Sequence, residues 1–163
     1  MAELSPGEAE FVDRMGLFYE QLGAPRTMGR VYGWLMICDP PSQSLTELAT
    51  ALGVSKASVS TVIRLLQDGG MVERLPSSGR QHHYRITPGG MTRVMQIQVP
   101  RMRVGVETAE FGLSVLDEHR VEQRELLDEF RDFCEFTERD VGDRFIRRWE
   151  EYRAERRRSR RGQ

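Results

Sequence analysis

Apolar residues recur at helical spacing along most of this chain, and a short central segment alternates apolar with polar residues instead. The spacing predicts an amphipathic helix over 8–21 and a second helix that begins near Pro25 and ends before Pro40. Gly29 and Gly33 lie one turn apart inside the second helix. Because a helical glycine costs about 1 kcal/mol relative to alanine, we expect another backbone, of the same chain or of a second subunit, to approach this face closely.

The segment 44–70 predicts two short helices joined by a tight turn. Ser44 and Glu47 match a capping box at the start of the first helix. Gly53 ends that helix, and Ser55 is a natural cap for the next one. The second helix has a single apolar face, with residues at i, i+3, i+4 and i+7. This face consists of Val59, Val62, Ile63 and Leu66.

A hairpin and two long helical regions follow. Strand-like runs at 71–75 and 81–86 flank a Pro-Ser-Ser-Gly turn signal. A long helix is expected over 88–113, kinked at Pro100, and a last helical region over 117–158 that Gly142 can divide. Two short helices and a hairpin form a winged helix-turn-helix. The predicted fold is therefore mainly α with a small β-wing, plus long terminal dimerisation helices.

The distribution of charge along the chain is more informative than the net charge of −1. Residues 1–25 carry net −4, and we assign them to an N-terminal helix that contributes to dimerisation. Residues 26–87 carry net +3 and form the predicted DNA-binding winged helix-turn-helix domain. Residues 88–163 are neutral but segregated, and they form the predicted C-terminal helical dimerisation region with a basic tail. Their apolar stripe is too long for one small domain to bury, so a homodimer is expected, although the helices could instead fold back on their own chain.

Composition excludes several classes of protein. No apolar run is long enough to span a membrane, and the acidic N-terminus lacks a secretory pattern, so a cytoplasmic location is expected. Cys38 and Cys134 are too isolated for a disulfide framework or a zinc site, and a redox-sensing thiol stays open. The chain has no phosphate loop, nucleophile elbow or catalytic grouping. We expect no enzyme activity, no catalytic residue, no cofactor and no metal.

The polar face of the helix after Ser55 fits the major groove of duplex DNA, which admits one α-helix. Small residues at its start let the backbone come close, and its N-terminus favours a phosphate. Arginine beside a flexible wing tip can enter the narrow minor groove. The alternative is an ordinary solvated helix face and an idle surface histidine pair. The predicted DNA contacts are Ser55, Lys56, Ala57, Ser58, Ser60, Thr61 and Arg64 on the helix, and Arg80, Gln81 and His82 on the wing.

The run LTELATALGVSKASVSTVIRLLQDGGMVERLPSSGRQHHYRIT resembles the DNA-binding core of the MarR superfamily. The preceding GAPRTMGRVYGWLMICDPP is similar to the GbsR-like branch, with its Gly-x-Pro-Arg and Gly-Arg-x-x-Gly patterns. The resemblance implies a homodimeric transcription regulator, usually a repressor, with its recognition helix on Lys56–Arg64 and its wing arginine at Arg80. Many MarR wings carry an acidic residue just before this arginine, whereas Ser78 and Gly79 stand here.

Candidates for an effector site are aromatic and methionine residues near the expected junction of the DNA-binding and dimerisation regions. Methionine adapts to varied apolar shapes, although such a stripe can equally be core. The candidates are Tyr32, Trp34, Met91, Met95, Met102 and Phe111.

Two functions compete for this pattern. The first is a dimeric repressor that binds a palindromic double-stranded DNA operator and is released by a small-molecule effector. The second is a winged-helix protein-interaction module without sequence-specific DNA binding. The arginine tail, 156–161, either adds nonspecific DNA affinity or is a solvated helix end.

Overall fold

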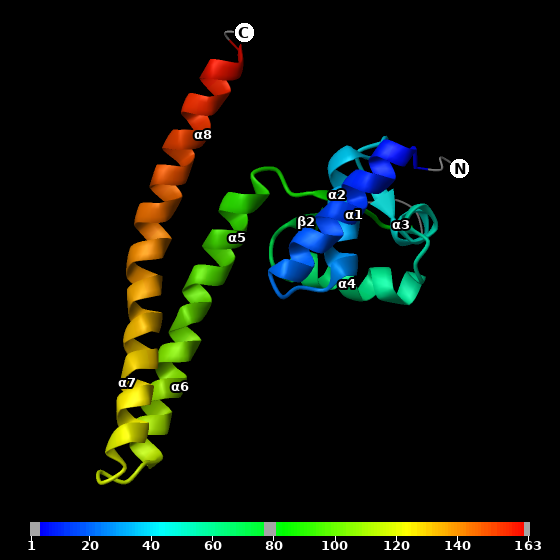
Figure 1. Cartoon of the computed structure of the whole chain (residues 1–163). Helices are drawn as coiled ribbons and strands as arrows, with labels where there is room; N and C mark the ends of the chain where they lie inside the picture. The colour runs from blue at the N-terminus through cyan, green and yellow to red at the C-terminus, as the bar shows by residue number, and fades with distance from the viewer. Residues whose placement is uncertain (1–3, 77–80, 162–163) are drawn as a thin grey trace. The chain divides into compact units, whose positions relative to one another are not determined.

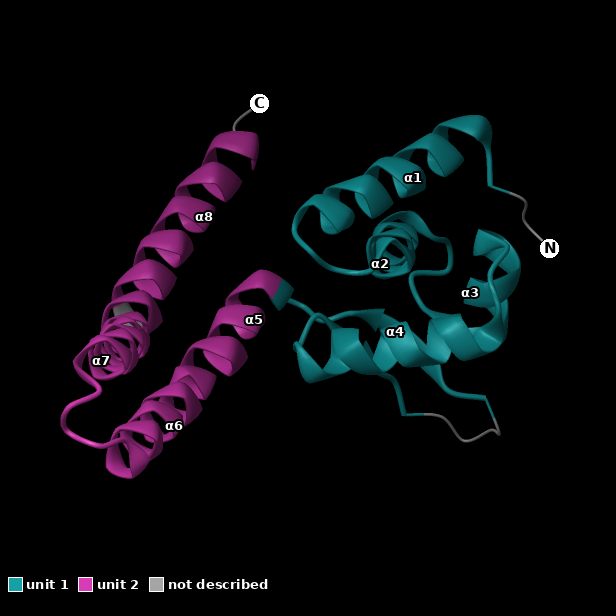
Figure 2. Cartoon of the chain, turned by 60° about the horizontal axis from the view of Figure 1, so that its bottom comes forward, with its two compact units in different colours: residues 1–90 teal, residues 91–163 magenta. Residues whose placement is uncertain are grey.

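The computed structural model describes residues 4–76 and 81–161, and the chain divides into two compact units, Met1–Gly90 and Met91–Gln163 (Figure 2). Helices dominate both units, and unit 1 holds a small antiparallel sheet of three strands. This arrangement confirms the predicted mainly α fold with a small β-wing and long C-terminal helices. Within the described residues, no helix combines the length and the apolar character that a membrane crossing requires.

In its described residues before α5, unit 1 contains four helices and the three strands, and Figure 1 shows their order by colour. The elements are α1 (Pro6–Gln21), α2 (Arg26–Ile37), β1 (Gln43–Ser44), α3 (Leu45–Leu52), α4 (Lys56–Asp68), β2 (Val72–Arg74) and β3 (His83–Ile86).

The helix ends are formed by the residues that the sequence indicates. Ser44 and Glu47 form the capping box of α3, with the Ser44 amide donating to a Glu47 carboxylate oxygen at 2.7 Å. Gly53 ends α3 in the left-handed conformation, at φ 62°, where a side chain would be strained. The Ser55 hydroxyl then accepts from the Ser58 amide at 3.1 Å and starts α4. Both predicted caps are confirmed.

The core of unit 1 lies between α2, α3 and α4. The apolar face of α4 is buried as predicted, and Leu66 is fully inaccessible. The glycine face of α2 packs on α1 of the same chain, which settles the partner that the sequence left open. A Cβ at Gly29 would collide with the carbonyl oxygen of Met15, and one at Gly33 would lie 2.8 Å from the Met15 Cβ.

The sheet joins the wing to the start of α3. Its strand order is β1-β3-β2, with Gln43 and Ser44 opposite Tyr84 and His83. The hairpin strands β2 and β3 fall inside the predicted runs. The sequence did not indicate β1, because a two-residue strand is too short to show an alternating pattern.

Unit 2 is built from α5 (Gly90–Gln98, which starts at the last residue of unit 1), η1 (Val99–Arg101), α6 (Met102–Val115), α7 (Val121–Phe136), η2 (Thr137–Phe145) and α8 (Ile146–Arg161). Pro100 lies in η1, a single 3-10 turn, so the predicted interruption of the long helix is confirmed. Gly142 lies in η2, a π-helical segment between α7 and α8. The helix predicted over 88–113 corresponds to α5, η1 and α6, which together run from Gly90 to Val115.

Small residues let α6 and α7 approach each other closely. The Cys134 Sγ would lie 2.6 Å from a Cβ at Gly105, and a Leu127 methyl carbon would lie 2.9 Å from one at Gly112. The Arg124 guanidinium donates to the carbonyl oxygens of Leu113 and Leu116, both at 2.9 Å, and so satisfies the C-terminal end of α6. The two helices therefore form a packed hairpin.

Candidate nucleic-acid interface

The polar face of α4 is exposed opposite its buried face. Lys56, Ala57, Thr61 and Arg64 are exposed, whereas Ser60 is half-buried. The Thr61 hydroxyl donates to the Ala57 carbonyl at 3.1 Å, so its proton is used within the helix and its methyl group and an oxygen lone pair remain for a partner. Arg64 forms no ion pair with any residue that the structure describes, which leaves its guanidinium available.

Two of the predicted helix residues serve the helix itself. Ser55 is exposed, but its hydroxyl accepts the Ser58 amide. Ser58 is half-buried at the first turn. Their small size keeps the N-terminus of α4 open, so the structure is consistent with close approach of a backbone phosphate there.

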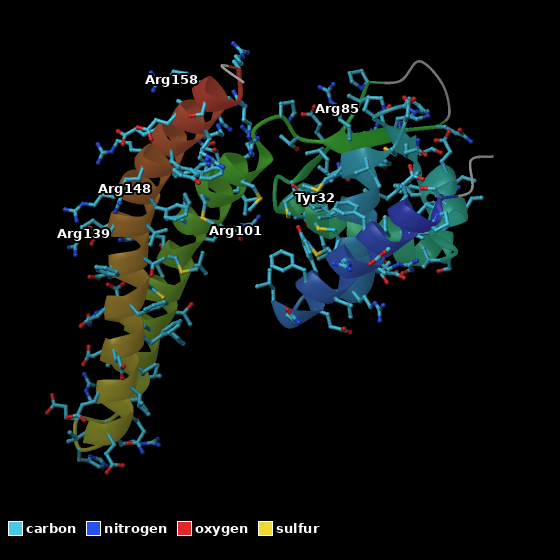
Figure 3. All side chains as sticks on the ribbon, turned by 45° about the horizontal axis from the view of Figure 1, so that its top comes forward. Tyr32, Arg85, Arg101, Arg139, Arg148 and Arg158 are labelled. Atoms are coloured by element: carbon cyan, nitrogen blue, oxygen red, sulfur yellow. The ribbon has the colours of Figure 1, made fainter. Side chains whose placement is uncertain are left out.

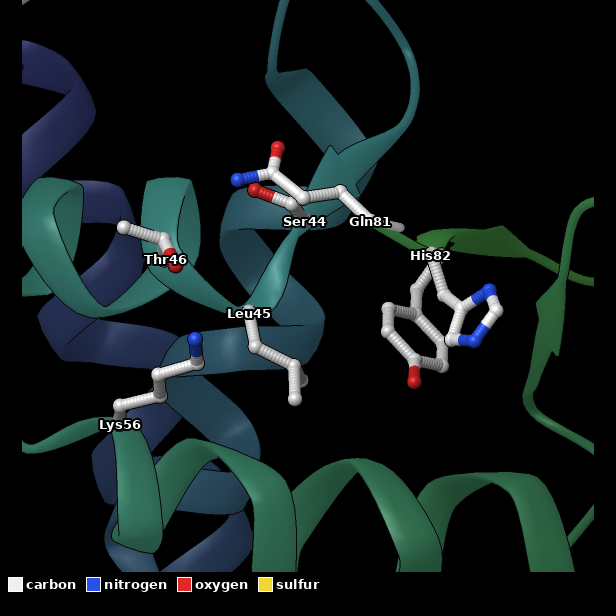
Figure 4. A pocket seen from close by; sticks show the side chains of 7 residues that line it. Ser44, Leu45, Thr46, Lys56, Gln81 and His82 are labelled. Atoms are coloured by element: carbon white, nitrogen blue, oxygen red, sulfur yellow. The ribbon is translucent and has the colours of Figure 1, made fainter. Parts of the chain in front are cut away.

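The structure brings Lys56 of α4 together with Gln81 and His82 of the wing. These residues line a cleft of about 120 Å³. Figure 4 shows Lys56 and Leu45 on the helix side of this cleft, and Gln81 and His82 on the strand side. The remaining lining residues are Ser44, Thr46 and Tyr84.

The electrostatics of this cleft favour an anion. The cleft contains the lysine ammonium and the first residues of α3, where helix amides and the positive end of the helix dipole lie. The Nδ1 atom of His82 is buried and has no hydrogen-bond partner among the described residues. An unsatisfied buried polar atom costs about 1–3 kcal/mol, so a bound group that completes it would stabilise the site.

Glu47 follows the cleft residue Thr46 in the sequence, and its carboxylate is engaged by neighbouring residues. Hydrogen bonds from the amide and hydroxyl of Ser44 lower the pKa of Glu47, and the nearby His83 lowers it further. His83 Nε2 lies 3.6 Å from a Glu47 carboxylate oxygen. Glu47 therefore stays ionised, with its carboxylate engaged by α3 and the sheet.

The sequence pattern did not single out Ser44, Leu45 and Thr46 as site residues. The capping box marks the start of a helix but does not show that the wing folds against it. That proximity comes from the β1–β3 pairing. The wing residue Arg80 lies outside the described residues, together with Ser78 and Gly79.

The predicted effector residues fall in both units. Tyr32 and Trp34 are buried in the core of unit 1, where the rings of Tyr32 and Tyr19 lie 5.9 Å apart. In unit 2, Met95 lines a cleft of about 260 Å³ between the α5–η1 segment and the η2–α8 segment. Met91, Met102 and Phe111 are not among the described residues that line it, and Phe111 is exposed on α6.

The two cysteines are separate and buried. Burial raises the pKa of the Cys38 thiol, which disfavours the thiolate that redox chemistry needs. Cys134 packs against Gly105 in the α6–α7 hairpin. Neither position offers the exposed, electropositive surroundings of a redox-sensing thiol.

Comparison with known proteins adds relatives for both units. A family model described as MmpR5-like MarR family transcriptional regulators matches residues 89–153, and a MarR family model matches residues 36–81. The HTH-type transcriptional regulator MmpR5 of Mycobacterium tuberculosis (strain ATCC 25618 / H37Rv) is 35% identical over 139 residues, which cover 85% of this chain and 84% of that protein. A crystal structure of a transcriptional regulator is 33% identical, with a TM-score of 0.79, and the match covers 90% of this chain and 99% of that one.

Proposed function

Because the chain belongs to the MarR family and is thus a DNA-binding transcription regulator, we propose that it acts as a homodimeric repressor released from its operator by a small molecule. In this proposal α4 is the recognition helix, and the wing contacts DNA beside it. The observation that carries the proposal is the exposed face of α4. This face holds Arg64, which has no ion-pair partner among the described residues, and Lys56, which lines a cleft together with residues of the wing.

We assign two kinds of contact to this surface. Arg64 and the Thr61 methyl group are placed to meet base edges in the major groove, where arginine pairs with guanine and methyl groups pack on thymine. Lys56, Gln81 and His82 are placed to hold a backbone phosphate, which positions the helix but carries no sequence information.

The dimer proposal follows from apolar side chains that unit 2 leaves exposed. Val104, Phe111 and Val115 recur at i, i+7 and i+11 on one face of α6. Leu126, Phe130 and Phe133 do the same on α7, at i, i+4 and i+7. We propose that a two-fold partner covers these stripes and that the two copies of α4 then contact half-sites about 34 Å apart, one turn of DNA. A palindromic operator then matches the symmetry of the protein.

The effector proposal is centred on the cleft that Met95 lines. The cleft lies between two interruptions of regular helix, η1 and η2. A π-helical segment often marks a functional position. A ligand that binds better to a dimer whose two recognition helices mismatch the operator would release the DNA.

We also propose a branch of the family, a role for each region of the chain and a location in the cell. The Gly-x-Pro-Arg and Gly-Arg-x-x-Gly patterns support a GbsR-like branch. The assignment of residues 88–163 to dimerisation and of 26–87 to DNA reading fits the exposed faces of α6, α7 and α4 described above. For residues 1–25, the exposed Leu17, Phe18 and Leu22 support a contribution to dimerisation. A cytoplasmic location follows from the proposed contact with an operator.

The recognition surface is tested with a duplex enriched from random DNA by selection on the wild-type protein. Arg64→Ala should weaken binding to this duplex by about 1–3 kcal/mol and relax the preference at one base position. Lys56→Ala should weaken selected and scrambled duplexes alike. Arg14→Ala, on an exposed arginine of α1 that is paired with Glu10, should change neither.

The outcomes separate the two competing functions. If the wild type enriches no sequence and binds no duplex even at low salt, the protein is a protein-interaction module and not a sequence-specific repressor. If Arg64→Ala and Lys56→Ala both bind and discriminate like the wild type, another face of unit 1 contacts the DNA.

A further inference from the structure

The arginines of α8 differ from those of the preceding helices. In α6, α7 and η2, four arginines each lie within 4.0 Å of a carboxylate oxygen: Arg103, Arg131, Arg139 and Arg144. In α8, eight arginines accompany three glutamates, and within the described residues none of the eight has an ion-pair partner.

The spacing of these side chains concentrates positive charge at the end of α8. Arg153, Arg157 and Arg161 succeed one another at i+4 and share one face of the helix. We call them the α8 arginine row. After Glu155 the described part of the helix has no further acidic residue. Like charges at this spacing repel one another, so the row gains stability when a negative partner neutralises it.

The α8 arginine row is accessible. Arg157 and Arg161 are exposed, Arg153 is half-buried, and no residue of α8 is fully buried. Figure 3 shows two other arginines of this helix, Arg148 and Arg158, extending away from the ribbon. The row borders a shallow surface hollow of about 480 Å³ that Glu150, Ala154 and Arg158 also line. A partner can therefore reach the guanidinium groups without any rearrangement of the helix.

We propose that the α8 arginine row binds the phosphate backbone of duplex DNA, independently of sequence and outside the surface that α4 offers. This inference rests on the proposed DNA-binding function and adds a second contact region to it. The rise of 1.5 Å per residue spaces the three guanidinium groups by about 6 Å along the helix axis. Along the DNA axis each strand carries one phosphate charge per about 3.4 Å, so several phosphates lie within the length of the row.

The chemistry of α8 favours phosphate over a lipid surface. A helix that lies on a membrane needs a broad apolar face opposite its charges. The large apolar residues of α8, Ile146, Trp149 and Tyr152, all stand in its first half, before the main run of arginines. The planar guanidinium fork matches phosphate oxygens in a bidentate geometry.

Salt titration of the full-length protein tests the proposal. Binding of the selected duplex and of a scrambled duplex is measured between about 50 and 200 mM salt, because each phosphate contact contributes about −0.9 to the slope of log affinity against log salt. The variant R153Q/R157Q/R161Q should make the slope shallower by about 2.7 per protomer on both duplexes. Over this salt range it should then lose about 40-fold less affinity per protomer than the wild type does.

A matched variant separates local contact from net charge. R103Q/R139Q/R144Q removes the same charge from paired arginines of the same unit and should leave the slope close to that of the wild type. Circular dichroism checks that both variants keep their helix content. An unchanged slope for the row variant, or an equal change in both variants, overturns the proposal.

If the wild-type protein binds no duplex, the proposed function is wrong. If the wild type prefers the selected sequence but the row variant keeps the wild-type slope, only this inference is wrong. Row-dependent binding to vesicles of phosphatidylserine and phosphatidylcholine, with no change of slope on DNA, would also overturn it and assign the row to anionic lipid.

Discussion

Units 1 and 2 differ in how many of their apolar residues they bury. Of the residues described, sixteen of the twenty buried hydrophobic residues belong to unit 1, while eleven of the seventeen exposed large hydrophobic residues belong to unit 2. Unit 1 closes its own core around α2 and α4. Unit 2 is a helical hairpin with few buried side chains, among them Val106 and Cys134.

This difference suits the two units to different structural roles. A unit that buries its own apolar surface can hold the proposed recognition helix, α4, in a fixed place. In the proposed dimer, a hairpin that leaves aromatic side chains exposed would gain stability from its partner, as obligate dimers do. The two tryptophans fall one in each unit, Trp34 and Trp149, so fluorescence can follow each unit separately.

The largest loss of stability should come from a substitution in the core of unit 1. Leu66→Ala, at a fully buried position of α4, should lower the free energy of unfolding by about 2–5 kcal/mol because it leaves a cavity. In a Trp149→Phe background, urea unfolding followed by Trp34 fluorescence measures this loss. It should not depend on protein concentration. Leu65→Ala, the exposed neighbour, should change stability by less than about 0.5 kcal/mol.

The next largest effect should come from the exposed stripe of α7. Phe133→Ala should weaken self-association by about 2–4 kcal/mol, which corresponds to a rise in Kd of about 30-fold or more. Sedimentation of wild type and variant over a range of concentrations measures it. Glu135→Ala, at an exposed charged neighbour, is the control. A wild type that stays monomeric at all concentrations would show that unit 2 is stable without a partner.

The close contact of α1 and α2 should be the third most sensitive point. Gly29→Ala places a Cβ against the Met15 backbone, and overpacking of this kind costs about 1–3 kcal/mol. Gly7→Ala, on α1 with nothing within 4 Å of the added carbon, should be neutral or slightly stabilising. Chemical unfolding monitored by Trp34 compares them. Equal stability of the two variants would mean that the helices separate easily.

The smallest effect concerns the ionised Glu47. Its pKa is lower in the folded state than in the unfolded chain, so its contribution is present at neutral pH and is lost as pH falls below the ordinary value of 4.5 through the lowered one. Half of this side chain is exposed, so we expect Glu47→Gln to cost no more than about 0.5 kcal/mol at pH 7. The difference from wild type should vanish in acid. A difference in unfolding free energy between wild type and variant that grows as the pH falls would contradict this expectation.

Local signals in the sequence were enough to predict the elements and the ends of the helices in unit 1. Caps at Ser44 and Ser55 and the break at Gly53 depend on residues within one helical turn, so spacing reveals them. The strand β1 was missed because its pairing with β3 joins segments about forty residues apart. Only that pairing shows that the start of α3 and the wing share a cleft.

The site was predicted unevenly for the same reason. The face of α4 follows from its period, so the exposure of Lys56 and Arg64 could be foreseen. The inward hydrogen bond of Thr61 could not, because a mid-helix threonine can direct its hydroxyl either way. The effector residues were chosen by residue type and by their expected place near the junction of the two regions, and neither shows that Tyr32 is core whereas Met95 lines a cleft.

Ser44 belongs to two structures at once: it is the cap of α3 and a member of the strand that pairs with β3. A saturation scan should therefore find position 44 far less tolerant than its exposed neighbour Thr46. Threonine and aspartate keep the cap, whereas larger apolar residues lose the cap and disturb the pairing. Residue 44 therefore links the two parts that flank the proposed phosphate, its hydroxyl by capping α3 and its backbone by pairing with β3.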